Sequence, residues 1–295
     1  MRVLVTGSQG SIGRYVTRAL LDAGYEVLGL GRRPRRQEEP FAYFPADISR
    51  QEALEAIAGQ IGALDAVVHC AAHISYDDAD SRLMLVNAAG TQNVVTLAKR
   101  CGAGKVVYLS SIPVIGVPVL LPIAEDHPLA PKTMYHVSKL AGEYIVKASG
   151  LGHTILRIAS PVGPGMSPKT ILPTFLSRCL AQEPLSLHGT GGRIQNYISM
   201  LDVARAVVLS LDGADGCYHL AGDSISNRDL AELCKRATRS RSEIVLSGVP
   251  DPEDRCRWEV SGEKARIQLG FVPQVGIERT IRSMLRANGE GEGNG

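Results

Sequence analysis

Three closely spaced glycines directly after an apolar segment constrain the fold of this chain more than any other feature. The segment VLVTGSQGSIG runs from Val3 to Gly13, and its glycines lie between a β-branched run and a stretch with helical spacing. Glycine at this density lets another group approach the backbone, and the first turn of a helix offers free N–H groups to an anion. The spacing therefore predicts a turn that holds the phosphates of a dinucleotide, with a purely structural glycine turn as the alternative.

Strand-like and helix-like segments alternate over the first part of the chain. The runs RVLVTG, EVLGLG, FAYFPAD, DAVVHCAA and KVVYLSS are interleaved with segments of helical spacing, among them 51–61, 81–101 and 135–149. Strands that alternate with helices of this length predict βαβ units. We therefore expect an α/β fold with a doubly wound parallel sheet and helices on both of its faces.

The regular alternation ends after Ser160, where the sequence becomes rich in proline and glycine. We expect a dinucleotide-binding domain over 1–165, to which 196–221 returns. The segments 166–195 and 222–288 are expected to form a smaller C-terminal substrate-binding region. The tail 289–295 has no apolar residue, and we expect it to be disordered.

Composition excludes several classes of protein. The net charge of +2 argues against a general nucleic-acid binder. No apolar run approaches the length of a membrane span and the N-terminus has no secretory signal, so we expect a cytoplasmic protein without a membrane partner. Six cysteines without a C-x-x-C pair predict reduced thiols, and the dispersed histidines predict no metal site.

The end of the second strand-like segment indicates which dinucleotide is preferred. Proteins that prefer NAD usually place an acidic residue there, which accepts a hydrogen bond from the ribose 2′-hydroxyl. This chain has Gly31, Arg32 and Arg33, and guanidinium groups suit the 2′-phosphate of NADP. We therefore expect NADP, with NAD as the second choice and a merely solvated basic turn as the alternative. Asp47, after the third strand, is placed to accept from the adenine amino group.

A second group of residues suggests acid–base chemistry. In YHVSK, Tyr135 and Lys139 are four residues apart and share one face of a helix. An adjacent ammonium group is expected to lower the pKa of the phenol from its ordinary value of about 10. Ser110 and Ser111 end a predicted strand, at the edge where parallel sheets hold ligands. Either serine can bind the substrate oxygen that Tyr135 protonates, or can instead cap a turn.

Together these motifs resemble those of the extended short-chain dehydrogenase/reductases, also called the NAD-dependent epimerase/dehydratase family. TGSQGSIG, HCAA, VNAAGTQNVV, MYHVSKLAGE, RIASPVGPG and LGFVPQVGIERTI resemble successive landmarks of that family, and the likeness covers nearly the whole chain. The resemblance implies a Rossmann domain, hydride transfer between a nicotinamide and a substrate carbon, and a catalytic triad of Ser111, Tyr135 and Lys139. It also implies a homodimer through the helices that begin near Ser81 and Tyr135.

The resemblance further implies two sets of binding residues. The cofactor-binding set is Gly7, Gln9, Gly10, Ser11, Ile12, Gly13, Arg32, Arg33, Asp47, Ile48, Ala71, Ala72, His73, Asn87, Tyr135, Lys139, Ser160 and Val162. The substrate-binding set is Ser111, Ile112, Tyr135, Arg193 and Gln195.

The chain departs from the family pattern at three places. Ile112 and Pro113 stand where sugar dehydratases usually carry an Asp-Glu pair, which argues against dehydration. Ile115 replaces the tyrosine of V-Y-G, and Gln195 stands where binders of nucleotide diphosphates often have arginine, with Arg193 two residues earlier as a substitute.

We therefore predict an NAD(P)-dependent oxidoreductase or epimerase that acts on a hydroxyl or keto group of a sugar nucleotide. An NADPH-dependent reductase of a smaller, non-nucleotide carbonyl compound is the alternative, and a non-catalytic NADP-binding sensor is a third hypothesis.

Overall fold

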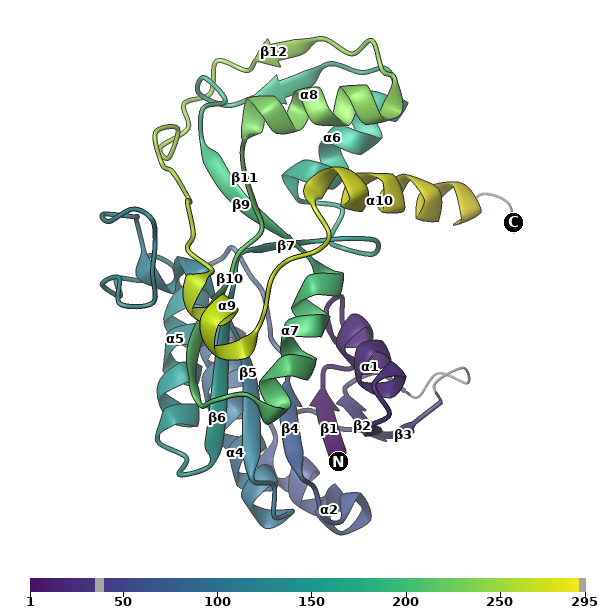
Figure 1. The fold of residues 1–295 in the computed structure, drawn as a ribbon, viewed down its shortest axis with the longest axis vertical. Coiled ribbons are helices and arrows are strands. Elements are labelled where there is room, and N and C mark those ends of the chain that lie inside the picture. Colours follow the sequence, from purple (N-terminus) through teal and green to yellow (C-terminus); the bar gives the residue numbers. More distant parts are fainter. Residues whose placement is uncertain (35–39, 292–295) are drawn as a thin grey trace.

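A seven-stranded parallel sheet forms the centre of the larger lobe of the computed structural model, which describes residues 1–34 and 40–291 (Figure 1). In spatial order its strands are β10 (Gly216–Leu220), β6 (Gly152–Ile158), β5 (Lys105–Ser111), β4 (Ala66–His69), β1 (Arg2–Thr6), β2 (Glu26–Gly31) and β3 (Ala42–Pro45). The strand order reverses between β4 and β1, which confirms the doubly wound sheet and places its switch point beside the glycine-rich turn.

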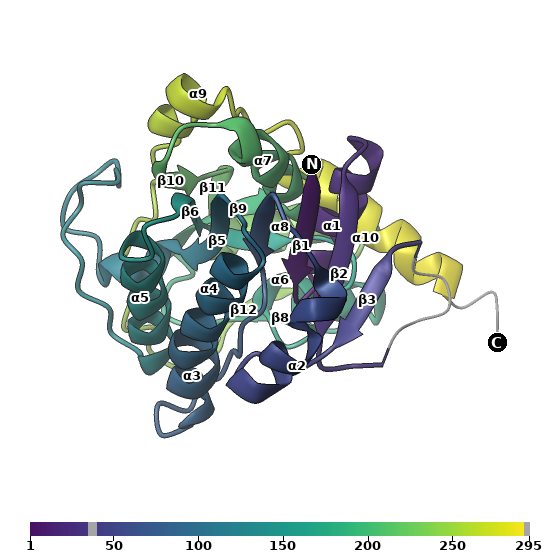
Figure 2. The same cartoon turned by 90° about the horizontal axis from the view of Figure 1, so that it is seen from below.

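Helices cover both faces of this sheet, as the view in Figure 2 shows. One face carries α2 (Gln51–Ile61), α3 (Arg82–Met84), the π-helical turn η1 (Leu85–Ala89), α4 (Gly90–Arg100) and α5 (Met134–Lys147). The other face carries α1 (Gly13–Asp22), α7 (Met200–Asp212) and α9 (Glu263–Leu269). Alternate residues of β1 face opposite sides, so Val3 belongs to the same core as Val207 of α7, while Leu4 belongs to the core that contains Leu54 of α2. Two separate apolar cores therefore hold the sheet between its helices.

A smaller lobe stands at the carboxyl end of the sheet (Figure 1), because β7 follows β6 directly. Its three-stranded sheet consists of β11 (Asp223–Ser226), β9 (Ile194–Ser199) and β7 (Ser160–Val162), and a parallel pair consists of β12 (Ile244–Leu246) and β8 (Leu185–Leu187). The helices α6 (Ile171–Leu180), α8 (Asn227–Thr238) and α10 (Ile277–Gly291) complete this lobe. Phe175, Leu230 and Ile281 from these three helices share one buried core.

The predicted lobe boundaries need three corrections. Residues 196–199 belong to β9, which pairs with β7 and β11 in the small sheet, so only α7 and β10 of the predicted return join the main lobe. Helix α9 was expected in the substrate region, but Ala265 and Leu269 are buried in the core of the main lobe, against α7 and β10. Helix α10 extends through 289–291 of the predicted disordered tail, and 292–295 lie outside the described residues.

Within the described residues, we find no helix with both the length and the apolar character needed to span a bilayer.

Candidate active site

The glycine-rich turn is closed by contacts that exclude side chains. Gly7 has φ +66°, and its N–H donates to the carbonyl of Leu30 at 2.6 Å. A Cβ atom at Gly7 would lie 2.8 Å from Cα of Ala71, and one at Gly13 would lie 2.0 Å from the Gly7 carbonyl oxygen. Both distances are shorter than real Cβ contacts, so the turn and the start of α1 require glycine at these positions.

The first turn of α1 offers free hydrogen-bond donors. The backbone N–H groups of Ser11 and Ile12 have no acceptor in the described part of the chain, although the N–H of Gly10 donates to Gly7 O at 2.8 Å. Gln9 Nε2 donates to the carbonyl of Pro34 at 3.0 Å, which ties the turn to the end of β2. The buried Oε1 of Gln9 has no partner among the described residues. Free N–H groups before a helix suit an anion, so the two N–H groups support the predicted phosphate contact, which stays a prediction.

Four further predicted cofactor residues lie at or near the same edge of the sheet. Arg32 and Arg33 are exposed at the end of β2, where the hydroxyl of Tyr43 donates to the Arg33 carbonyl at 2.8 Å. Asp47 Oδ1 accepts from the backbone N–H and the hydroxyl of Ser49 at 2.9 and 2.8 Å, which fixes the carboxylate after β3. Ile48 is buried in the core beneath, so its side chain packs within the protein.

A chain of hydrogen bonds crosses the sheet below this edge. The backbone N–H of Ala71 donates to Thr6 Oγ1 at 3.2 Å, and Thr6 Oγ1 lies 2.6 Å from His69 Nδ1. His69 Nε2 lies 3.0 Å from Thr91 Oγ1, which donates to the carbonyl of Asn87 at 2.6 Å. Because Thr91 uses its hydroxyl proton for the Asn87 carbonyl, Nε2 of His69 donates to Thr91 and carries the proton of the neutral imidazole. Burial lowers the pKa of His69 to about 3, so this histidine is a structural link.

Asn87 connects the loop after β4 to α5. It lies in the π-helical turn η1, and its Oδ1 accepts from the His73 N–H at 2.7 Å. Its Nδ2 donates to the His73 carbonyl at 2.8 Å and to Ser138 Oγ at 2.9 Å, and Ser138 Oγ donates to the carbonyl of Tyr135 at 2.7 Å. Both amide hydrogens are therefore used within the protein. The structure gives Asn87 a framework role, and its predicted cofactor contact stays a prediction.

The structure also places the other predicted cofactor residues of the loop after β4, which are Ala71, Ala72 and His73. Ala71 and Ala72 follow β4 at the carboxyl edge, and Ala72 is exposed. His73 Nε2 pairs with Asp80 at 2.7 Å, so its ring is tied to the loop rather than to His69. The described residues contain no cluster of side chains that could hold a metal ion.

Tyr135 and Lys139 lie in the first turns of α5, as predicted, but their pKa values move in an unexpected direction. Burial, with a smaller effect from Tyr76, raises the pKa of Tyr135 to about 12. Burial lowers the pKa of Lys139 to about 7 against the opposing effect of Glu143. The ammonium nitrogen lies 4.2 Å from the ring centre of Tyr108. The prediction that Lys139 lowers the pKa of the phenol is wrong for this structure, because burial disfavours the charged form of both groups.

The structure separates the two candidate serines. Ser110 Oγ is buried and donates to Glu143 Oε1 at 2.6 Å, so this hydroxyl belongs to the protein interior. Ser111 ends β5, is partly exposed, and precedes the 3₁₀ turn η2 (Ile112–Ile115). Ser111 is therefore the serine available to a ligand. The side chains of Ile112 and Ile115 are buried in the core, which argues against the predicted substrate contact of Ile112.

The predicted substrate residues of the smaller lobe are engaged with their neighbours. Arg193 forms an ion pair with Asp251, and its Nη1 lies 3.3 Å from Oε2 of Glu253. Gln195 Nε2 donates to Asn227 Oδ1 at 3.3 Å. The guanidinium of Arg193 is thus already neutralised by two carboxylates.

Two predicted cofactor residues, Ser160 and Val162, lie in β7, where the two lobes meet. Ser160 pairs with Tyr197 and Val162 with Ser199 of β9. Ser160 is partly exposed, whereas Val162 is buried in the core of the smaller lobe.

Sequence reasoning missed one pair of residues beside the site. Glu143 and Arg157 form a buried ion pair directly beneath the end of β5. The available signal was a single arginine inside the apolar strand segment TILRIA, since a buried charge needs a partner.

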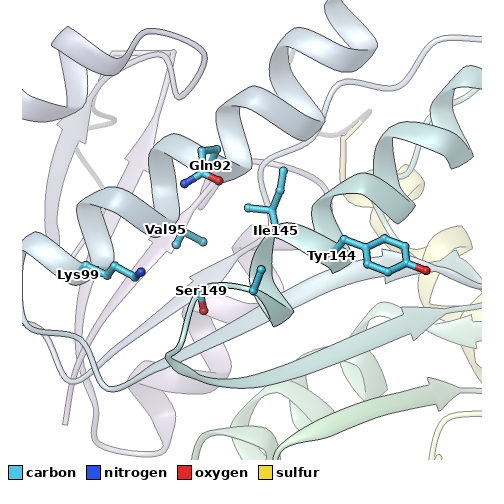
Figure 3. A pocket seen from close by; sticks show the side chains of 7 residues that line it. Gln92, Val95, Lys99, Tyr144, Ile145 and Ser149 are labelled. Carbon is cyan, nitrogen blue, oxygen red and sulfur yellow. The ribbon is translucent and has the colours of Figure 1, made fainter.

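A groove of about 320 Å³ lies between α4 and α5 (Figure 3). Its lining residues are Gln92, Val95, Lys99, Tyr144, Ile145, Ala148 and Ser149. None of them belongs to either predicted binding set, so we treat this groove as separate from the candidate site.

A doubly wound sheet with a phosphate-binding turn and a tyrosine–lysine pair at its carboxyl edge defines a class of dinucleotide-dependent enzymes. The model of the NAD dependent epimerase/dehydratase family matches residues 3–219. The chain therefore belongs to this family of NAD-dependent enzymes.

Individual relatives resemble the chain over nearly its whole length. A UDP-glucose 4-epimerase of Azospirillum brasilense is 30% identical over 96% of this chain and 91% of its own length. The structure of Thermus thermophilus UDP-glucose 4-epimerase in complex with NAD is 27% identical, with a TM-score of 0.86 over 97% of this chain and 98% of that one. A Streptomyces venezuelae dTDP-glucose 4,6-dehydratase with NAD and TYD bound is 27% identical, with a TM-score of 0.87 over 99% and 98%.

Proposed function

We propose that this chain transfers hydride at a hydroxyl- or keto-bearing carbon of a sugar nucleotide, as an epimerase or an oxidoreductase. The observation that carries the proposal is the position of Ser111, Tyr135 and Lys139 at the carboxyl edge of the sheet that also carries the glycine-rich turn. Relatives that act on UDP-glucose and dTDP-glucose support the substrate class.

The proposed chemistry divides between the cofactor and the chain. NAD(P) supplies the hydride acceptor and donor when it is bound. The phenol of Tyr135 exchanges a proton with the substrate oxygen, which the hydroxyl of Ser111 holds by a hydrogen bond. The buried side chain of Lys139, one helical turn after Tyr135, holds the ribose of the cofactor.

We propose epimerisation or oxidation–reduction rather than dehydration. Loss of water needs an acid and a base next to the reacting carbons. Directly after Ser111 the chain offers Ile112 and Pro113, and the side chain of Ile112 is buried. Neither residue can exchange a proton.

We propose NADP as the preferred cofactor, with NAD as the second choice. The exposed guanidinium groups of Arg32 and Arg33 support this preference, because they suit a 2′-phosphate. The relatives solved with NAD are the argument for the second choice.

One observation favours a second function, reduction of a smaller carbonyl compound. The pairing of Arg193 with Asp251 and Glu253, and of Gln195 with Asn227, leaves these residues without a free charge for a diphosphate. A substrate without phosphate would need no such charge.

A homodimer through α4 and α5 is part of the proposal. The groove between these helices has a largely buried floor at Val95, and Tyr144 at its rim is 60% exposed (Figure 3). A second copy of the chain would cover this apolar ring.

The test compares the parent with Tyr135→Phe and, as a matched control, Tyr144→Phe on the same helix. Each protein is incubated with NADP or NAD and with UDP-glucose, dTDP-glucose or simple ketones, and epimers and cofactor reduction are followed by NMR and absorbance. We expect conversion of a sugar nucleotide by the parent and Tyr144→Phe, and a loss of at least about 100-fold in Tyr135→Phe. Equal activity of Tyr135→Phe and the parent would contradict the proposal, and conversion of simple ketones alone would favour the second function.

A further inference from the structure

Glu143 is a fully buried carboxylate whose hydrogen bonds come from two strands. Its side chain has no exposed surface. Arg157 of β6 donates from Nε to Oε1 and from Nη2 to Oε2, both at 2.9 Å, in the two-pronged geometry of strong arginine–carboxylate pairs. Ser110 of β5 adds a third donor at 2.6 Å. Burying such a charge is costly unless it is paired, and here both oxygens of Glu143 accept hydrogen bonds, so we treat the three side chains as one unit.

This unit lies beside the candidate catalytic residues. Glu143 follows Lys139 by four residues and Tyr135 by eight, so all three share one face of α5. Ser110 directly precedes Ser111, and it pairs in register with Arg157 of β6. The carboxylate thus connects the helix that carries the phenol to the strand end that carries the serine.

We propose that Glu143 is a positioning residue, which fixes the rotation of α5 against β5 so that Tyr135 and Ser111 face the same substrate oxygen. The inference rests on the proposed function, because it concerns the alignment of two groups that act on one atom. Alignment of this kind matters because a displacement of about 1 Å can cost about 100-fold in rate. Glu143 itself does not reach the substrate, since it is enclosed by Ser110 and Arg157.

The neighbouring cation on the same helix does not replace this connection. Lys147 Nζ lies 4.0 Å from Glu143 Oε2 and is 40% exposed, so it contacts the carboxylate from the solvent side of α5. Because both residues lie on α5, this contact does not connect the helix to the sheet. Among the described residues, the side-chain hydrogen bonds between α5 and the sheet are those of Glu143 to Ser110 and Arg157 and a longer one from the Tyr108 hydroxyl of β5 to the Lys139 carbonyl at 3.3 Å.

The chain offers a matched pair of serine variants for the test. Ser110→Ala removes the 2.6 Å bond to Glu143, and Ser210→Ala removes a 2.6 Å bond from another buried serine to the carbonyl of Ala206 in α7. The two variants lose the same group and a bond of the same length, but only the first touches the connection between α5 and β5. Glu143→Gln keeps the shape and removes the charge.

The first readout is the kcat and KM of each variant with the sugar nucleotide that the parent converts. We expect Ser110→Ala and Glu143→Gln to lower kcat by about tenfold or more with KM within about twofold, because the loss lies in alignment rather than in binding. The double variant that combines Ser110→Ala with Glu143→Gln should be no slower than Glu143→Gln alone, since both changes disrupt the same group of hydrogen bonds. Ser210→Ala should keep the kcat of the parent.

The second readout needs no substrate. Hydrogen exchange over residues 134–142 should be about tenfold faster in Ser110→Ala than in Ser210→Ala, because a bond to a charged group is lost only there. This readout also decides the inference if Glu143→Gln fails to fold or if the parent converts no sugar nucleotide, an outcome that would refute the proposed function alone. Equal kcat values in Ser110→Ala and Ser210→Ala would overturn the inference. If the parent is inactive, equal rates of hydrogen exchange over 134–142 in these two variants would overturn it.

Discussion

The buried amine of Lys139 should contribute more to the stability of the cofactor-free protein as the pH rises from about 7 to about 9. Burial lowers the pKa of this amine from 10.5 to about 7 in the folded protein. In this range the unfolded chain therefore holds a proton that the folded protein has released. Stability rises with pH wherever the unfolded state binds more protons, by about 1.4 kcal/mol per pH unit for one proton. Between about pH 7.5 and 9.0 the gain amounts to about 2 kcal/mol.

Other buried groups set the limits of this range. Burial lowers the pKa of His69 and of His219 to about 3, so their protonation in the unfolded chain reduces stability only as the pH falls below about 6.5. Burial raises the pKa of all six cysteines above 9.0, so the unfolded thiols lose their protons first and oppose the gain from Lys139 as the pH approaches 9. The contribution of Lys139 is therefore measured as a difference between variants, in which the cysteines cancel.

The measurement is urea unfolding of the parent, Lys139→Met and Lys99→Met at about pH 7.5 and 9.0. Lys99 is exposed on α4, so the stability of Lys99→Met should change with pH as that of the parent does. Lys139→Met keeps the length of the side chain and removes the titrating group, so its stability should fall by about 2 kcal/mol relative to the parent between the two pH values. If the stability of Lys139→Met changed with pH as that of the parent does, the reasoning would be refuted.

Two other predictions concern the cofactor site. Gly13→Ala should weaken NADPH binding by at least about tenfold, because its Cβ would lie 2.0 Å from the carbonyl oxygen of Gly7. The control is Gly59→Ala on α2, whose Cβ would meet nothing within 4 Å. This control should keep the affinity for NADPH and raise the free energy of unfolding by about 0.5–1 kcal/mol. Fluorescence titration measures the affinities and urea unfolding the stabilities; unchanged NADPH affinity in Gly13→Ala would contradict the close approach of the cofactor to this turn. The parent should bind NADPH more tightly than NADH, and changing Arg32 and Arg33 together to Ala should weaken NADPH binding by about tenfold while leaving NADH binding unchanged. Equal affinities of the parent for NADPH and NADH would refute the proposed preference.

Local patterns predicted the main lobe because they are set by the chain's own periodicity. The predicted segments 26–31, 51–61 and 105–111 match β2, α2 and β5 residue for residue. Strands buried on both faces are apolar throughout, and the helices between them show a clear polar face. The assignments of β9 and α9 to a lobe were wrong because both depend on partners distant in sequence. A pairing between β9 and β7, or between Leu269 and the main core, leaves no mark on the local pattern.

The candidate site was predictable to the same extent. Helical spacing placed Tyr135 and Lys139 on one face, and the end of a strand placed the serines at the sheet edge. Spacing could not choose between Ser110 and Ser111, because the choice depends on Glu143, which lies on another element. For the same reason the sequence offered Arg193 as a free cation, although Asp251 and Glu253 fold back onto it from a distant loop.

The opposite pKa changes of Tyr135 and Lys139 have the same main cause, and that cause bears on the direction of proton transfer. Burial favours the neutral form of each group, so it raises the pKa of the phenol to about 12 and lowers that of the amine to about 7. At neutral pH the phenol of the cofactor-free protein is therefore a proton donor, which is the form that reduction of a carbonyl oxygen requires. Oxidation of an alcohol requires the phenolate, which added positive charge or hydrogen-bond donors near its oxygen would stabilise. The spacing of the two residues determines that they can act together, whereas the packing around them determines which of the two carries a proton.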